Sequence, residues 1–170
     1  VKVEPDALSA VLALAVGREY DAVSIMTRLE CHGFSEPLIL PLCAASVGAM
    51  TLMSLTNDDN RRQFAFANGQ FFLIRRSAYE AVGGHGAVRD NITEDVALMR
   101  LLKSSDYRTR LFFGRDFAST RMHTSIRQMF NGWARIFSGV SDRKTGAIWI
   151  NMLFVLSGFL AYAAIAYGIA

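Results

Sequence analysis

Two adjacent carboxylates, Glu94 and Asp95, have the type and position to take part in acid–base chemistry. They follow Thr93 and precede an apolar, helix-forming run that ends near Lys103. A carboxylate held at the start of a helix can act as a general base and remove a proton from a hydroxyl group. A structural role is the alternative. Thr followed by acids is also an ordinary helix start, in which Thr93 caps the helix and the acids favour its dipole.

Two further segments carry polar groups that could serve the same site. Upstream, Asn68, Gly69 and Gln70 run into a buried-strand pattern over 71–74. Gly69 would permit close approach of a ligand to the backbone, although Asn followed by Gly is equally typical of a plain turn. Downstream, an amphipathic segment over 125–135 has one Trp among cations. Candidate binding residues therefore lie on both sides of the acidic pair.

Hydrophobic periodicity predicts the elements that position these segments. The stretch 22–26 reads as a short buried strand, and 107–113 alternates as a second strand. The stretch 7–16 is predicted as an amphipathic helix capped by Asp6. The face that packs against a sheet is expected to consist of Leu8, Val11, Leu12 and Ala15.

The segment 75–84 is expected to form a short capped helix. Ser77 and Glu80 have the spacing of a capping box, in which each side chain bonds to the other residue's backbone amide. Gly83 or Gly84 can take the left-handed conformation that closes a helix. This helix separates the strand at 71–74 from the acidic pair.

In their order and spacing, these motifs resemble the second half of a membrane-bound family 2 glycosyltransferase. The shared features are an Asn-Gly-Gln before a strand, a Gly-Gly-His after a short helix, a Thr-Glu-Asp that opens the next helix, and an Arg/Trp helix before a membrane span. The resemblance covers nearly the whole chain and is greatest to the ceramide-glucosyltransferase-like and hopanoid-associated bacterial branch. It implies an α/β fold, the C-terminal half of a Rossmann-like GT-A domain with a mixed sheet, followed by a transmembrane helix.

The resemblance also implies an activity, that of an inverting hexosyltransferase. The enzyme would move a sugar from a nucleotide-sugar donor to a lipid or other membrane-associated acceptor. Asp95 would be the general base, and Glu94 would shape the acceptor pocket. The implied substrate-binding residues are Asn68, Gly69, Gln70, Arg127, Gln128, Trp133 and Arg135. A membrane-tethered binding or scaffold domain of the same fold is the alternative from another class.

One departure from the family pattern bears on processivity. The family has a Gln or Arg, two spacers and then Arg-Trp, whereas here four residues separate Gln128 from Trp133 and Gly132 replaces the Arg. The broken pattern favours transfer of a single sugar and leaves a processive polysaccharide synthase as the second alternative.

The resemblance implies a divalent metal, Mg²⁺ or Mn²⁺, held by an Asp-x-Asp motif. That motif is absent from this sequence and is expected upstream of Val1, so this chain by itself is expected to be an inactive part of a longer enzyme. His123 is a second candidate ligand, although a lone His is more often a hydrogen-bonding or surface residue. Asp58 and Asp59 lie in a polar run that reads as a turn rather than a metal site.

Composition favours a membrane over a nucleic acid as the partner. The chain is 52% hydrophobic and 19% charged, and a net charge of +3 gives little support to nucleic-acid binding. Residues 147–170 carry no charge and are long enough to cross a bilayer, so a transmembrane helix is predicted there. Arg135, Arg143 and Lys144 precede it, which places the catalytic domain, 1–146, on the cytoplasmic side of the inner (plasma) membrane.

A second uncharged stretch, at about 37–56, is also near the length of a span. A single crossing there would put the two halves of the predicted site on opposite sides of the membrane. We therefore expect an interfacial or re-entrant helix, with a buried core helix as the alternative. Cys31 and Cys43 have neither zinc-site nor disulfide-framework spacing and are expected to be free thiols.

Overall fold

The computed structural model describes residues 1–51, 53–122, 125–140 and 145–168. The chain folds as two compact units, the first formed by 1–30 and 51–122 and the second by 31–50 and 123–170. It is a mixed α/β protein with mixed sheets, as the sequence predicted at this level.

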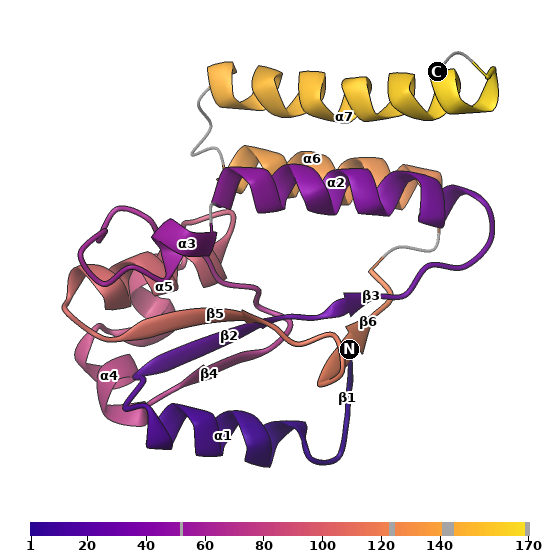
Figure 1. Cartoon of the computed structure of the whole chain (residues 1–170). Helices are drawn as coiled ribbons and strands as arrows, with labels where there is room; N and C mark the ends of the chain where they lie inside the picture. The colour runs from indigo at the N-terminus through magenta and orange to yellow at the C-terminus, as the bar shows by residue number, and fades with distance from the viewer. Residues whose placement is uncertain (52, 123–124, 141–144, 169–170) are drawn as a thin grey trace. The chain divides into compact units, whose positions relative to one another are not determined.

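The first unit contains two three-stranded sheets (Figure 1). In one, the central strand β2 (Ala22–Met26) pairs antiparallel with β4 (Phe72–Ile74) and parallel with β5 (Thr109–Phe113). In the other, β6 (Ala118–Thr120) pairs antiparallel with β1 (Lys2–Val3) and parallel with β3 (Arg28–Leu29). The strands predicted at 22–26, 71–74 and 107–113 are confirmed.

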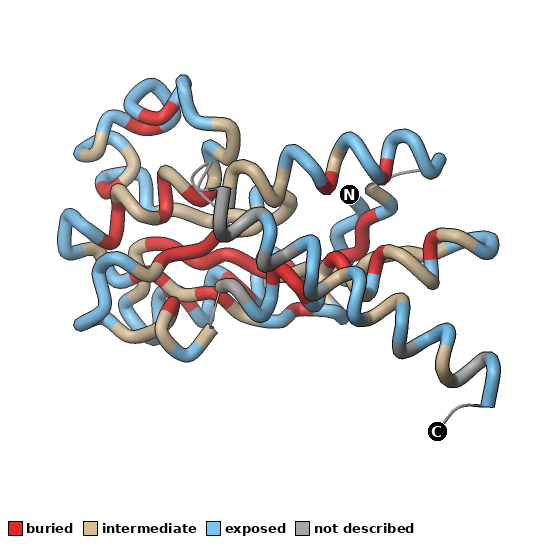
Figure 2. Tube along the Cα trace, turned by 90° about the horizontal axis from the view of Figure 1, so that it is seen from above, coloured by how far each residue is buried: buried red, intermediate tan, exposed pale blue. Residues whose placement is uncertain are grey.

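The central strand β2 is covered on both faces. Ala22, Val23, Ser24 and Ile25 are each 0–1% exposed, and buried residues run along this strand in Figure 2. Because successive side chains of a strand point to opposite faces, Val23 and Ile25 pack with helix α1 while Ala22 packs with helix α5. Ser24 therefore shares the α5 face with Ala22.

Helix α1 (Ala7–Gly17) covers the first face, and α5 (Glu94–Ser104) covers the second (Figure 1). The predicted packing face of α1 is partly wrong. Leu8 and Leu12 are 57% and 48% exposed, and the buried side chains are Ala7, Val11 and Ala15. These buried residues recur every four positions and so lie on one face of the helix.

The predicted capping box of α4 (Arg76–Ala81) is wrong. The helix begins at Arg76, one residue before Ser77, and within the described part of the chain its N-terminus has no side-chain cap. Glu80 instead forms an ion pair with Arg76, Oε1 to Nε at 2.8 Å. Gly83 and Gly84 do take the left-handed conformation, with φ of 79° and 54°, and lead into the 3-10 helix η1 (Gly84–Val88).

The second unit is helical. Its helices are α2 (Ser35–Thr51, of which Thr51 belongs to the first unit), α6 (Ile126–Val140) and α7 (Thr145–Ala166). The described residues of the uncharged stretch at 37–56 are helical, in α2 and in α3 (Met53–Thr56), which belongs to the first unit. Its placement at a membrane stays a prediction. Cys31 and Cys43 are free thiols.

A helix also covers most of the predicted transmembrane segment, 147–170. Among the residues that the structure describes, however, no helix combines the length and the apolar character needed to cross a membrane. The predicted span is therefore not found in α7.

Candidate functional site

Asp95 is the second residue of α5, and Glu94 is the first. Glu94 is exposed, whereas the Asp95 side chain is half-buried. The predicted cap by Thr93 is wrong, because within the described residues its side chain accepts no hydrogen bond from the first turn. The two carboxylates thus lie in different environments despite being adjacent.

The Asp95 carboxylate is held by two backbone amides. Val96 N donates to Oδ1 at 2.8 Å, and Gly69 N donates to Oδ2 at 2.7 Å. The first bond is local, whereas the second joins α5 to the loop before β4. The structure therefore brings together Asp95 and the Asn68-Gly69-Gln70 segment, as the sequence predicted.

The environment of Asp95 raises its pKa above the usual value of an aspartate. Burial is the largest cause, and the adjacent Glu94 carboxylate acts in the same direction. The N–H groups of Val96 and Gly69 stabilise the ionised form and oppose the rise in the pKa. Asp95 is thus a stronger base than an exposed aspartate, which the sequence alone could not decide.

The loop that carries Gly69 is docked on the carboxyl end of β2. The Asn68 side chain donates from Nδ2 to Ile25 O at 3.2 Å and accepts at Oδ1 from Gln70 N at 3.2 Å. The Gln70 side chain accepts from Thr27 Oγ1 at 2.5 Å. A Cβ atom added at Gly69 would lie 3.0 Å from Asp95 Oδ2, so the Asp95 side chain would have to move by a few tenths of an ångström to admit it.

Ser24 and Thr27 belong to this group and were missed from the sequence. Ser24 Oγ accepts from Asn68 N at 2.7 Å and donates to Asn68 O at 3.2 Å. The one available signal was a serine inside an otherwise apolar buried strand, because a buried hydroxyl needs a hydrogen-bond partner. The identity of that partner, 44 residues away, was not readable from the sequence.

The remaining predicted binding residues lie on α6 in the second unit. Arg127, Gln128 and Arg135 are exposed, and Trp133 is 7% exposed. The Trp133 ring packs against Phe137 at 5.7 Å between centroids, and its Nε1 is buried without a hydrogen-bond partner among the described residues. The group around Asp95 consists of residues of the first unit.

The candidate metal ligands do not form a metal site in the described part of the chain. His123 lies outside the described residues. Asp59 forms a two-bond ion pair with Arg110, at 2.5 and 2.8 Å, and this partner lowers the pKa of Asp59. Within the part of the chain that the structure describes, no group of three or more His, Cys, Asp and Glu side chains could hold a metal ion.

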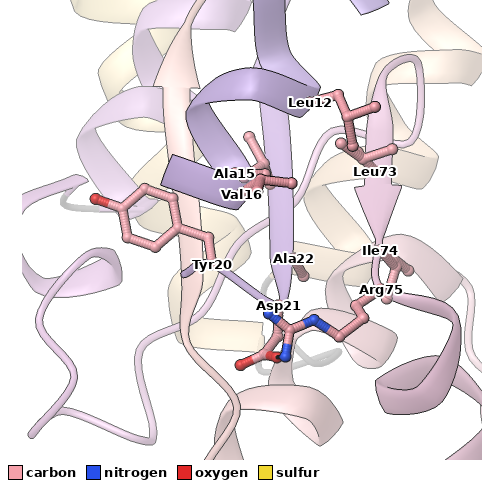
Figure 3. A pocket seen from close by; sticks show the side chains of 10 residues that line it. Leu12, Ala15, Val16, Tyr20, Asp21, Ala22, Leu73, Ile74 and Arg75 are labelled. Carbon is pink, nitrogen blue, oxygen red and sulfur yellow. Dashed lines mark ion pairs between the residues drawn. The ribbon is translucent and has the colours of Figure 1, made fainter. Parts of the chain in front are cut away.

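Two cavities of the first unit are separate from this group. One, of about 130 Å³, lies between α1 and the sheet at the amino end of β2, where Asp21 and Arg75 form an ion pair at 3.0 Å (Figure 3). The other, of about 370 Å³, lies along the face of α5 that carries Ala97 and Arg100. Asp95 lines neither of these cavities of the described structure.

The comparisons with known proteins identify no relative. No family model matches the chain, and neither a curated protein nor a solved structure shows significant similarity to it. A function therefore has to be argued from the site and from the order of the motifs.

Proposed function

We propose that this chain carries the acceptor-activating part of a family 2 glycosyltransferase with a GT-A fold. The observation that carries the proposal is the Asp95 carboxylate, which has a raised pKa and is held by the Gly69 amide beside the carboxyl end of β2. In open α/β sheets, ligands bind in the crevice outside the carboxyl ends of the strands. Asp95 is the one sequence-predicted catalytic side chain that is both half-buried and next to that edge.

The proposed step is a single displacement with inversion. Asp95 takes the proton of an acceptor hydroxyl while the hydroxyl oxygen forms a bond to the anomeric carbon of the donor. The bond from that carbon to the diphosphate oxygen breaks, and the nucleoside diphosphate leaves with the electron pair. A raised pKa suits Asp95 to this role, because a general base works best when its pKa approaches the working pH.

The neighbours of Asp95 have supporting roles in this proposal. Glu94 is exposed at the rim and would meet the acceptor. Asn68, Gly69 and Gln70, of which Gly69 bonds to Asp95, would line the donor and acceptor site. Arg127 and Arg135 belong to the second unit and are exposed, and their contact with a diphosphate stays a prediction from the sequence.

A divalent metal, Mg²⁺ or Mn²⁺, would supply further neutralisation of the diphosphate. The described residues do not fit such an ion, because they contain no cluster of three or more potential His, Cys, Asp or Glu ligands. The roles given to Asp95 and its neighbours do not depend on it.

We also propose a lipid acceptor and contact with a lipid surface. Large apolar side chains are exposed along one stripe of α7, at Trp149, Met152, Leu153, Leu156 and Leu160. A contiguous exposed apolar stripe is typical of a surface that meets lipid or another protein. The inner membrane and a cytoplasmic catalytic domain are the corresponding location. Gln128 and Trp133 lie in the segment that departs from the family's motif, in which Arg precedes Trp. That departure favours the addition of one sugar.

The test is a transfer assay with the full-length protein made from the complete reading frame and kept in its membranes. Labelled nucleotide sugars are supplied one at a time, and the lipid fraction is analysed by mass. The proposal predicts a product that is one hexose heavier than a membrane lipid. Binding of a nucleotide sugar without transfer of any sugar would instead favour the scaffold domain, and long homopolymers would favour the processive synthase.

A further inference from the structure

We infer that Ser24 is a positioning residue whose hydroxyl orients the Asn68–Gly69 peptide so that the Gly69 N–H is directed at Asp95 Oδ2. The functional meaning of this inference rests on the proposed role of Asp95 as the base. The geometry itself is independent of that role. Ser24 lies below the site and acts through the loop rather than on a substrate.

Ser24 forms two hydrogen bonds with the backbone of Asn68. Ser24 is 0% exposed in the middle of β2, and its side chain is on the α5 face of the sheet. Its Oγ accepts from Asn68 N at 2.7 Å and donates to Asn68 O at 3.2 Å. A hydroxyl can both donate and accept, so one side chain fixes both polar groups of this residue's backbone.

The planarity of the peptide bond then determines the direction of the Gly69 N–H. In a trans peptide the C=O of one residue and the N–H of the next point in opposite directions. The Asn68 carbonyl is held on one side by Ser24 and by Phe71 N, which donates to it at 3.2 Å. The Gly69 N–H must then point to the other side, where it meets Asp95 Oδ2 at 2.7 Å.

The other side-chain contacts described for the loop do not act on this peptide plane. Asn68 Nδ2 bonds to Ile25 O, and Thr27 bonds to the side chain of Gln70. These contacts dock the two ends of the turn on β2. Ser24 is the side chain that holds the Asn68 carbonyl, and therefore the one that sets the direction of the Gly69 N–H.

The consequence is control of the base by a residue that does not touch it. The Gly69 N–H stabilises the ionised Asp95 and opposes the effect of burial on its pKa. Without Ser24, the Asn68 carbonyl keeps its bond from Phe71 N, but the Asn68–Gly69 peptide is held less firmly and the Gly69 N–H is a poorer donor to Asp95 Oδ2. Asp95 would then hold its proton to higher pH, because one of the two backbone hydrogen bonds to its carboxylate would be weaker.

The experiment uses the full 170-residue chain with ¹³C-labelled aspartate. The Asp95 carboxyl is titrated by NMR, and hydrogen exchange of the Gly69 amide is measured in the same samples. In Ser24→Ala we expect a higher Asp95 pKa than in the parent and Gly69 exchange that is about fivefold faster or more. Ser24→Cys fills nearly the same space with a weaker hydrogen-bonding group, so it should move both quantities in the same direction by less.

The matched control is Ser119→Ala. Ser119 is also a buried strand serine, 2% exposed, and its Oγ donates to Glu30 Oε1 at 2.7 Å, but it lies in the other sheet. It should leave the Asp95 pKa and the Gly69 exchange rate at their parent values. The inference is overturned if Ser24→Ala and Ser24→Cys match Ser119→Ala in both quantities.

This readout needs no turnover, so the inference and the proposed function can fail separately. A rise in the Asp95 pKa in Ser24→Ala supports the positioning role of Ser24, whatever the outcome for sugar transfer. Transfer of sugar by an Asp95 variant would contradict the proposed role of Asp95 as the base and would leave the positioning role of Ser24 standing.

Discussion

The amide of Gly69 and the carboxylate of Asp95 are 26 residues apart in the chain and meet at 2.7 Å. This bond joins the loop that docks on the carboxyl end of β2 to the first turn of α5. The N–H favours the ionised form of Asp95 and so offsets part of the effect of burial, which raises the pKa of this carboxylate.

Gly69→Ala tests the closeness of the contact. The new methyl group would lie 3.0 Å from Asp95 Oδ2 and 3.3 Å from its Cβ, so the carboxylate must shift. We expect sugar transfer by the full-length protein to fall about tenfold or more, because small displacements of a catalytic group are costly. Gly86→Ala is the control, since nothing in the described structure lies within 4 Å of a Cβ there, and it should keep parent activity. Equal activities of the two variants would contradict the prediction.

Asp95 also predicts a pH dependence of stability. Its folded-state pKa is raised, so between the unfolded-state pKa of about 4 and the folded-state pKa the folded chain keeps a proton that the unfolded chain has released. The contribution of Asp95 to stability is therefore complete below about pH 4 and is lost as the pH rises through its folded-state pKa.

Urea unfolding of the parent and of Asp95→Asn over a pH series measures this difference, because the other titrating groups are common to both. The free energy of unfolding of the parent should fall relative to that of the variant as the pH rises. A difference that grows in favour of the parent with rising pH would have the wrong sign.

Lys103 is expected to be a main support of α5. It is 3% exposed, and its Nζ donates to the carbonyls of Thr56 at 2.6 Å and Phe64 at 2.7 Å. Lys103→Met keeps the apolar stem but leaves these buried carbonyls without their donor. We expect a loss of about 2–4 kcal/mol in the free energy of unfolding.

Arg76→Met is the control for Lys103→Met, because it removes a cation whose ion pair is on the surface. Its side chain is 90% exposed, and such pairs contribute little, so its effect should stay below about 1 kcal/mol. Chemical unfolding measures the free energy of unfolding of both variants. Similar losses in the two variants would contradict the role given to Lys103.

The central elements were predictable because their signals are local. A run of buried apolar residues marked β2, and the acids after Thr93 marked the start of α5. The capping roles of Thr93 and Ser77 were wrong because a cap depends on backbone angles and on competing partners. Arg76 takes Glu80, and Thr93 has φ of −116° and ψ of 81°.

The contacts that build the site could not be read from the sequence. Ser24 reaches Asn68 across 44 residues, and which amide meets Asp95 depends on how the loop docks on β2. The exposed Leu8 and Leu12 show the same limit, because a helical pattern allows two adjacent faces and the sheet selects the one with the smaller side chains. Long-range packing therefore decides the details that chemistry depends on.

The most direct measurement is sugar transfer by the Asp95→Asn variant of the full-length protein in its membranes. Asn has nearly the size of Asp, and its one amide oxygen can still accept from one of the two backbone N–H groups, while the bond to the other is lost; folding and donor binding of the variant are therefore measured beside turnover. Loss of a general base should lower turnover by about a hundredfold or more. Asp90→Asn is the control, since Asp90 is exposed in the preceding loop and should be replaceable without loss. Turnover of Asp95→Asn within a few-fold of the parent would contradict the assignment of Asp95 as the base.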